Sequence, residues 1–201
     1  MQNHSTQRLV CVFGVSGVGK STMLRDYVAS HPGWMHLIAG DVLSAMMRQD
    51  SEALRTSGTE DIQANQRLLV ERILEICARH PDKRVLLDAH CVIDNGAGFV
   101  KVPVAAIEDL HPDLLVCVWD EAARIQVRRA CATDRIRPER TVAQLDNYQK
   151  TVVETCEEYG EELDIELVKV RAGDGAGLAD VLSEPALGSY LGRGAANREP
   201  K

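Results

Sequence analysis

The sequence predicts an α/β fold with a five-stranded parallel sheet and helices on both of its faces. The first observation is an alternation, in which strand-like apolar runs at residues 8–13, 34–39, 84–88, 114–119 and 165–170 are separated by helical segments. Such alternation is typical of βαβ units, whose crossover helices cover a parallel sheet on both sides. The second observation is a glycine-rich loop between the first strand-like run and the helical segment that follows it.

The glycine-rich loop fits the G-x-x-x-x-G-K-[ST] pattern of phosphate-binding loops. It consists of Gly14, Val15, Ser16, Gly17, Val18, Gly19, Lys20 and Ser21, and Thr22 follows it. Glycines let the backbone bring successive N–H groups towards phosphate oxygens, and the helix that begins near the lysine adds its positive N-terminal end. We therefore expect Lys20 to reach the β- and γ-phosphates of ATP and the hydroxyl of Ser21 to bind Mg²⁺.

The length of 201 residues is sufficient for one domain with a normal core. We expect this domain to span residues 1–183, and residues 184–201 to form a flexible C-terminal tail. The formal net charge of −7 argues against a general nucleic-acid binder, because such proteins are usually basic. The chain contains no run of about 18 or more apolar residues, which a membrane-spanning helix would need.

The cysteines and the N-terminal residues bear on the compartment of the protein. Six cysteines are scattered along the chain without a C-x-x-C pair, and residues 1–6 lack the pattern of a secretory signal. Free thiols are typical of a reducing compartment. We therefore expect a cytoplasmic protein whose partner is a small-molecule phosphate acceptor, and not nucleic acid or a membrane.

Asp88 is the second candidate ligand of magnesium. It closes the strand-like run at 84–88, and an acidic residue at the carboxyl end of a core strand beside a phosphate loop can hold the Mg²⁺ shell, directly or through water. The alternative is a strand-end aspartate that only accepts local backbone N–H bonds. Because the phosphate loop lies upstream, we favour the metal role.

Positive charge is concentrated in one part of this acidic chain. The arginines within 17 positions of one another are Arg124, Arg128, Arg129, Arg135, Arg137 and Arg140. A solvated helix face would usually mix charge signs, and Asp134 and Glu139 are the only acidic residues interspersed here. We therefore expect arginines of this segment to contact a transferring phosphoryl group.

Turn signals and apolar periodicity predict the helix boundaries. The expected helices run over 42–49 after an Asp41 cap, up to His80-Pro81, from Asp120 onwards, over 141–159 before Gly160, and over 178–182 after a flexible turn at 171–177. Residues 89–102 are expected to form a loop at the carboxyl edge of the sheet, where ligands bind. A lone histidine there, His90, is more often structural than a catalytic base.

With these features placed, the chain resembles the nucleoside monophosphate kinases, and most closely the archaeal-type adenylate kinases, from about Leu9 to Leu182. The resemblance rests on the loop at 14–22, Gly40-Asp41, Asp88-Ala89-His90, the spaced arginines and the Gly-Asp-Gly turn at 173–175. It implies a three-layer P-loop NTPase fold with sheet order 2-3-1-4-5. It also implies ATP and Mg²⁺ as cofactors and a short lid at about 129–140.

The resemblance further implies the roles of individual residues. As catalytic residues it implies Lys20 together with Arg128, Arg135 and Arg137. Near the adenine of ATP it places Arg124, Gly173 and Gly175. In the acceptor site it places Asp41, Arg55, His90 and Asp94. Asp94 stands where the family has an arginine that grips the acceptor's phosphate, and we expect its carboxylate to repel a nucleoside monophosphate.

The sequence thus predicts an ATP- and Mg²⁺-dependent phosphotransferase that transfers the γ-phosphate to a nucleoside monophosphate, with AMP as the expected acceptor. Two alternatives stay open. One is a P-loop kinase acting on a non-nucleotide acceptor, for which Asp94 or Asp41 would accept the hydroxyl proton. The other is an ATP-binding regulatory protein that hydrolyses ATP slowly and signals to a partner.

Overall fold

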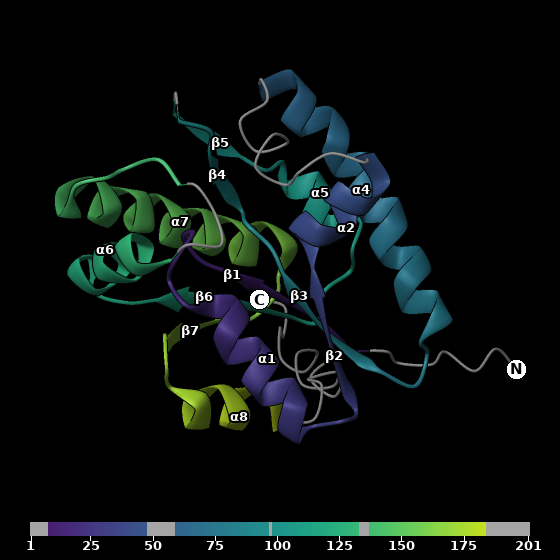
Figure 1. Ribbon diagram of the computed structural model, residues 1–201. Helices are drawn as coiled ribbons and strands as arrows, with labels where there is room; N and C mark the ends of the chain where they lie inside the picture. Colours follow the sequence, from purple (N-terminus) through teal and green to yellow (C-terminus); the bar gives the residue numbers. More distant parts are fainter. Residues whose placement is uncertain (1–7, 48–58, 97, 133–136, 184–201) are drawn as a thin grey trace, which may run out of the picture.

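The computed structural model describes residues 8–47, 59–96, 98–132 and 137–183, and within these ranges the side chains of all but residues 59–64. Five parallel strands form one sheet in the order β2-β3-β1-β6-β7 (Figure 1). These strands are β1 (Leu9–Phe13), β2 (Trp34–Ile38), β3 (Arg84–Asp88), β6 (Leu114–Trp119) and β7 (Leu167–Arg171). Counted along the chain as the five strands of this sheet, the order is 2-3-1-4-5, so the predicted fold class is confirmed.

The central strand β1 is buried along its whole length, because strands on both sides and helices on both faces cover it. In the parallel register Val12 of β1 pairs with Asp88 of β3, and Phe13 pairs with Cys117 of β6. The carboxyl ends of these three strands therefore meet at one edge of the sheet. The phosphate loop begins at this edge, directly after Phe13.

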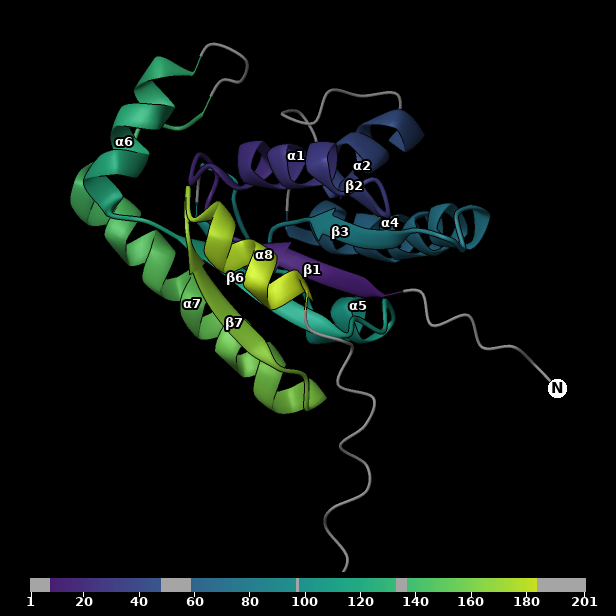
Figure 2. The same ribbon diagram turned by 90° about the horizontal axis from the view of Figure 1, so that it is seen from below.

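The helices lie in two layers around the sheet. They are α1 (Lys20–Ser30), α2 (Ala39–Met47), α4 (Thr59–Arg79), α5 (Val104–Glu108), α6 (Ala122–Cys131), α7 (Val142–Leu163) and α8 (Gly175–Ser183). Helices α1 and α8 contact each other on one face, and α5 and α7 contact each other on the other face (Figure 1). Both views place α6 on one side of the loop before α1, and α2 and α4 on the other side (Figure 2).

One segment that we expected to be a loop contains a β-hairpin. Within residues 89–102, β4 (Val92–Asp94) pairs antiparallel with β5 (Phe99–Lys101). The apolar residues Val92 and Val100 are buried, and the chain reverses at Gly96, which has a φ of 88°. The expectation of a loop over the whole segment was therefore wrong, because its two short apolar runs can bury side chains against α7.

Several helix boundaries also differ from the prediction. Asp41 does not cap α2, since this helix begins at Ala39 and Asp41 lies in its first turn. Gly160 does not stop α7, which continues to Leu163 and ends at a left-handed Asp164. A Cβ at position 160 would lie 3.1 Å from the backbone oxygen of Ile165, so this glycine allows a close approach of the returning chain.

The last helix begins earlier than expected, at Gly175, because the Asp174 carboxylate accepts a hydrogen bond from the backbone N–H of Gly177 at 2.8 Å. The predicted tail, 184–201, lies outside the described residues. In the described part of the chain, no helix is long and apolar enough to cross a membrane.

Candidate active site

The phosphate loop connects β1 to α1 with a backbone that is left-handed at two of its glycines. Gly17 and Gly19 have φ values of 86° and 106°, in the left-handed region that other residues rarely adopt. Gly19 is the N-cap of α1 and supplies no side chain to the first turn of the helix. The N–H groups at this helix end therefore stay available to an anion, as the sequence pattern predicts.

A buried ion pair lies directly beneath the loop. The Nζ of Lys20 is 2.5 Å from Oδ1 of Asp88, and the two side chains are only 5% and 4% exposed. The other carboxylate oxygen of Asp88 accepts a hydrogen bond from the hydroxyl of Ser21 at 2.6 Å and lies 3.3 Å from Nε2 of His36. The predicted phosphate-binding lysine and both predicted magnesium ligands thus form one cluster.

The protonation state of Asp88 follows from this cluster. Burial by itself would raise its pKa, but the charge of Lys20 and the hydrogen bonds from His36, Lys20 and Ser21 outweigh burial and hold the pKa well below the usual range. Asp88 is therefore an anion at neutral pH. A carboxylate and a hydroxyl oxygen side by side are suitable ligands for Mg²⁺, which prefers oxygen and is usually completed by waters and substrate phosphates.

His90 connects the hairpin segment to the phosphate loop. Its Nδ1 lies 3.0 Å from the carbonyl oxygen of Gly14, and because a carbonyl only accepts, this nitrogen carries the hydrogen. The contact agrees with the structural role expected for a lone histidine here. His90 also lines the cavity described below, where it was predicted to lie.

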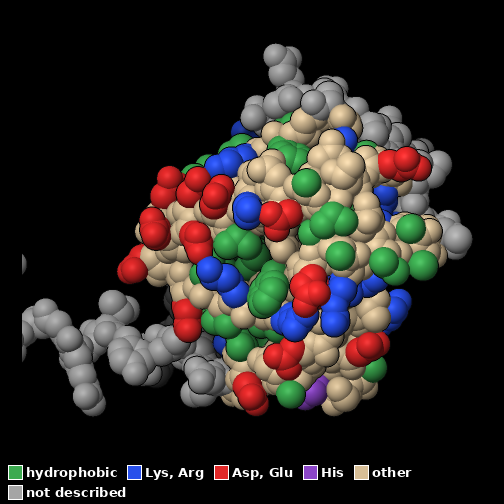
Figure 3. Space-filling model, turned by 90° about the vertical axis from the view of Figure 1, so that its left-hand side faces the viewer, with side chains coloured by type: hydrophobic (Ala, Val, Ile, Leu, Met, Phe, Trp, Pro, Cys, Tyr) green, Lys and Arg blue, Asp and Glu red, His purple; other side chains and the backbone are tan. Residues whose placement is uncertain are grey.

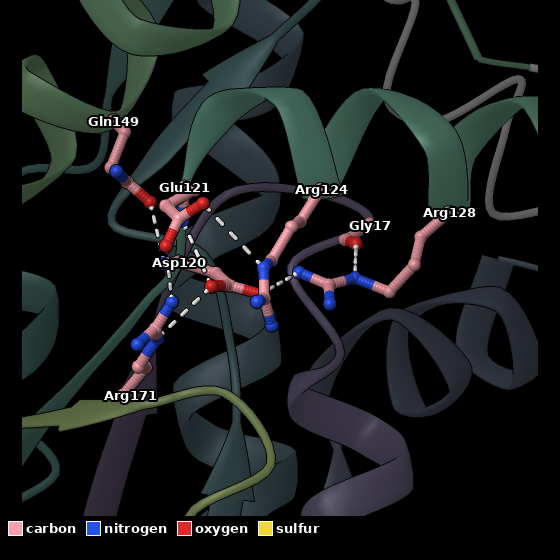
Figure 4. Close-up of polar contacts among 7 residues, drawn as sticks. All are labelled: Gly17, Asp120, Glu121, Arg124, Arg128, Gln149 and Arg171. Carbon is pink, nitrogen blue, oxygen red and sulfur yellow. Dashed lines mark hydrogen bonds and ion pairs between the residues drawn. The ribbon is translucent and has the colours of Figure 1, made fainter.

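Arg128 of α6 contacts the loop and is held in place by a buried carboxylate (Figure 4). Its Nε donates to the carbonyl oxygen of Gly17 at 3.3 Å, and its Nη2 donates to Oδ2 of Asp120 at 2.6 Å. Asp120 is 1% exposed and also accepts hydrogen bonds from Nε of Arg171 and from the backbone N–H of Glu121. Burial would raise the pKa of Asp120, but the hydrogen bond from Arg128 and the other contacts lower it.

Asp120 is a residue whose role we did not predict, since it was read only as the start of a helix. The helix begins two residues later, at Ala122, and Asp120 instead orients two arginines. The available signal was its position directly after a buried strand-like run, the same position that identified Asp88. Nothing in the sequence indicated that Arg171, 51 residues further along the chain, would contact Asp120.

The residues predicted near adenine lie beside this network. Arg124 is 61% exposed and projects from the same side of α6 as Arg128, with its Nε 3.5 Å from Glu121 (Figure 4). The turn that contains Gly173, with a φ of 87°, leads to Gly175 at the start of α8. A Cβ at Gly19 would lie 3.8 Å from Cβ of Ala172, so the residue just before this turn lies against the phosphate loop.

The segment after α6 also contacts the loop. Nε of Arg137 donates to the hydroxyl of Ser16 at 3.3 Å, and Nη2 of Arg129 donates to the carbonyl oxygen of Pro138 at 2.7 Å. These contacts involve residues at the two ends of the segment 129–140, which we predicted to be a short lid. Two predicted site residues, Arg135 in the lid and Arg55 in the acceptor site, lie outside the described residues.

A cavity of about 520 Å³ joins these groups into one site. The residues of its donor side are the loop, Lys20, Asp88, Arg128 and Arg137, and those of the opposite wall include Gly40, Asn65, Leu69, Ile73, Ile107 and Leu110. Asp41 is not among the lining residues, although its neighbour Gly40 is. The structure thus brings the donor-side residues together and leaves Asp41 at the margin.

Asp94 lies in this cavity but is not a free negative charge. Its two oxygens accept hydrogen bonds from Nη2 and Nε of Arg140 at 2.8 and 3.2 Å, and its side chain is only 2% exposed. Burial would raise its pKa, but Arg140 and the backbone N–H of Gly96 lower it. Asp94 is therefore not the unpaired charge on which the expected repulsion of an acceptor phosphate rested, because Arg140 pairs with it from 46 positions further along the chain.

The sequence of the chain is similar to a known family and to known enzymes. A family model described as an AAA domain matches residues 13–146. The chain is 26% identical over 149 residues to the adenylate kinase of Methanopyrus kandleri, covering 71% of this chain and 77% of the relative. It is 28% identical over 149 residues to the adenylate kinase of Methanothermobacter thermautotrophicus, covering 71% and 78%.

Solved structures with a similar fold include two shikimate kinases. The enzyme from Acinetobacter baumannii, solved in complex with shikimate, matches with a TM-score of 0.61 at 15% identity, covering 93% of this chain and 97% of its own. The enzyme from Bacteroides thetaiotaomicron matches with a TM-score of 0.58 at 12% identity, covering 88% and 99%. At these identities the matches show a shared fold.

The ion pair between Asp94 and Arg140 gives a prediction for stability. Arg140→Ala leaves a buried carboxylate without its partner and should lower the free energy of unfolding by about 1–3 kcal/mol at pH 7. Because the pKa of Asp94 is lowered in the folded protein, its contribution is present above the ordinary value of 3.8 and is lost as the pH falls below it. Urea denaturation at pH 7 and below pH 4 measures the effect, which should shrink at the lower pH.

Arg79→Ala is the matched control for this measurement. Arg79 lies 3.9 Å from Glu75 on an exposed stretch of α4, and such a surface pair contributes about 0–1 kcal/mol. Equal losses of stability in the two variants at pH 7 would contradict the assignment of Asp94–Arg140 as a stabilising pair.

Proposed function

The chain belongs to the AAA domain family. From this we propose that it is an ATP- and Mg²⁺-dependent phosphotransferase. We propose a nucleoside monophosphate as its acceptor, with AMP as the first candidate. The observation that carries the proposal is the cluster of Lys20, Ser21 and Asp88 under the phosphate loop, with Arg128 on the same cavity. The similarity in sequence to two archaeal adenylate kinases supports it.

The donor side of the cavity provides positioning and positive charge, which phosphoryl transfer chiefly requires. The loop N–H groups and Lys20 hold the β- and γ-phosphates, and Arg128 and Arg137 approach from α6 and the segment after it. Ser21 and Asp88 would hold Mg²⁺, which neutralises charge on these phosphates when bound. An acceptor oxygen then bonds to the γ-phosphorus while the bond to the β–γ bridging oxygen breaks, leaving ADP.

The state of the carboxylates favours a phosphate acceptor over an alcohol. An alcohol must lose a proton, and a general base works best with a pKa near the working pH. Among the described residues, Asp88 and Asp94 are the two carboxylates that line the cavity, and their partners lower the pKa of both. An acceptor phosphate oxygen is already deprotonated at neutral pH, so it needs no base.

Surface charge and cysteine chemistry support the two remaining expectations, a small-molecule acceptor and a location in the cytoplasm. On the face that carries α6 and α7, acidic and basic side chains stand side by side (Figure 3). Helix α7 carries the ion pair Lys150–Asp146, and the pair Lys169–Glu157 joins β7 to α7. A face of mixed sign offers little to a nucleic-acid backbone, so we propose a small-molecule acceptor. All six cysteines are free thiols, which fits the reducing cytoplasm.

The first prediction about this function concerns the phosphate-binding lysine. Lys20→Ala removes the positive charge from the β- and γ-phosphates and should lower the rate of transfer by about a hundredfold or more. Coupled-enzyme detection of ADP measures the rate, and circular dichroism checks that the fold is intact. Lys83→Ala, which changes a partly exposed lysine that donates to the carbonyl oxygen of Pro32 and does not line the cavity, is the control. A folded Lys20→Ala protein with full activity would refute the mechanism.

The second prediction concerns the carboxylate that orients Arg128. Asp120→Asn keeps the size of the side chain but removes the charge that holds this arginine against Gly17, so kcat should fall about tenfold. Glu121→Gln is a neighbouring control, because Glu121 contacts Arg171 and Arg124 but not Arg128. Steady-state kinetics of both variants measure the effect. An unchanged kcat in Asp120→Asn would show that the charge of Asp120 is not needed to orient Arg128.

The third prediction distinguishes the proposed function from its alternatives. Incubation of the protein with ATP, Mg²⁺ and each nucleoside monophosphate should yield the corresponding diphosphate, while a panel of small alcohols should yield no phosphate ester. Chromatography of the products measures both. Transfer to alcohols alone would favour the non-nucleotide kinase. ATP hydrolysis that no acceptor stimulates would favour a regulatory ATP-binding protein.

A further inference from the structure

A second hollow of the molecule lies on its surface, between the hairpin β4–β5 and α7. This hollow, which we call the outer groove, has a volume of about 350 Å³. The residues that line it are Phe99 of β5, Arg140, which precedes α7, and Ala143, Gln144 and Asn147 of α7. None of these residues lines the active-site cavity, so the outer groove is a separate candidate site.

Two pairs of side chains connect the outer groove to the active-site cavity. The ring of Phe99 stacks on the ring of Tyr148, with centroids 4.6 Å apart and planes 12° from parallel, and Tyr148 lines the cavity. Arg140 holds the carboxylate of Asp94, which lines the cavity as well. A ligand in the outer groove would therefore contact residues that directly touch residues of the active site.

Three side chains of the outer groove offer hydrogen-bond donors. Arg140 donates to Asp94 with Nε and Nη2, and its Nη1 makes no hydrogen bond to a described residue. The side-chain amide of Asn147 makes none within the described ranges either. The Oε1 of Gln144 accepts from the backbone N–H of Thr141, which leaves its NH₂ group to donate. Since no acidic side chain of the described residues lines the groove, these donors favour a ligand with anionic oxygens.

Phe99 adds an aromatic surface to these donors. The residue is 37% exposed although Tyr148 covers one face of its ring, so the other face is open to a second ring. The guanidinium group of Arg140 prefers the oxygens of a carboxylate or a phosphate. The outer groove therefore suits a flat aromatic molecule that carries such an anionic group beside its ring.

We propose that the outer groove binds a small aromatic anion, and that this anion weakens acceptor binding in the active-site cavity through Arg140 and Asp94. The bound anion shares the charge of Arg140, so the carboxylate of Asp94 is less compensated and repels the phosphate of a nucleoside monophosphate. This effect on the acceptor rests on the proposed function, whereas binding in the groove does not. Because coupling between two sites is reciprocal, a bound acceptor weakens binding of the anion by the same factor.

Calorimetric titration with naphthoate, an aromatic carboxylate, tests binding in the outer groove. A saturating non-hydrolysable ATP analogue with Mg²⁺ is present, so that the phosphate loop is occupied. We expect one naphthoate to bind per chain. Phe99→Leu keeps an apolar side chain but removes the ring, so the affinity should fall about fivefold. Asn147→Asp places a negative charge beside the anion and should lower the affinity about fivefold or more.

Ser30→Asp is the matched control, because it adds the same charge at the exposed last residue of α1, which lines neither the cavity nor the groove. Its affinity for naphthoate should equal that of the wild type, and circular dichroism checks the fold of every variant. The site is refuted if the wild type binds no naphthoate, or if both groove variants keep the wild-type affinity while folded.

Steady-state kinetics test the effect on the active site. Saturating naphthoate should raise KM for AMP about fivefold or more in the wild type. Asp94→Asn removes the repelling charge, so this variant should still bind naphthoate while its KM for AMP no longer responds. An unchanged KM in the wild type, or an equal rise in both proteins, would overturn the coupling through Asp94. If the wild type phosphorylates no nucleoside monophosphate, the proposed function fails, and calorimetry still decides whether the groove binds the anion.

Discussion

The ion pair between Lys20 and Asp88 lies where the core of the protein becomes its active site. Both side chains are nearly inaccessible to solvent, so neither charge could stay in place without the other. The pair forms only when β1 and β3 align as they do, with Val12 opposite Asp88, and His36 on β2 and Ser21 on α1 join the same carboxylate. The register of three strands and the geometry of phosphate binding therefore depend on one contact.

The same principle is repeated around the cavity. Three carboxylates at strand ends each hold a cation, in the pairs Asp88–Lys20, Asp120–Arg128 and Asp94–Arg140. All three carboxylates are at most 4% exposed, which makes their side chains rigid anchors. Lys20 and Arg128 line the cavity and meet incoming phosphates in fixed positions, so little reorganisation is needed when negative charge arrives. Arg140 serves a different purpose, since it cancels the charge of Asp94 and closes the hairpin against the start of α7.

The sheet and the phosphate loop could be predicted from the sequence because their signals are local. A buried parallel strand is a short apolar run, and the loop is a pattern of eight consecutive residues. The pairings of Asp120 and Asp94 could not be predicted, because their partners Arg171 and Arg140 lie 51 and 46 positions away. Sequence shows that a carboxylate follows a strand, but which cation it meets depends on the packing of distant elements. For this reason Asp94 was read from the sequence as an unpaired carboxylate, whereas the structure pairs it with Arg140.

The contact between Gly17 and Arg129 has a consequence for the evolution of the loop. Gly17 occupies a position that the phosphate-loop pattern leaves open, yet a Cβ there would lie 2.5 Å from Cγ of Arg129. Glycine is thus required at position 17 by the packing of α6 against the loop and by the local backbone. In a chimera that combined this loop with the helix equivalent to α6 from a relative, the residue at position 17 would therefore be constrained, although the motif allows any residue there. The phosphate loop and α6 would therefore have to be exchanged together.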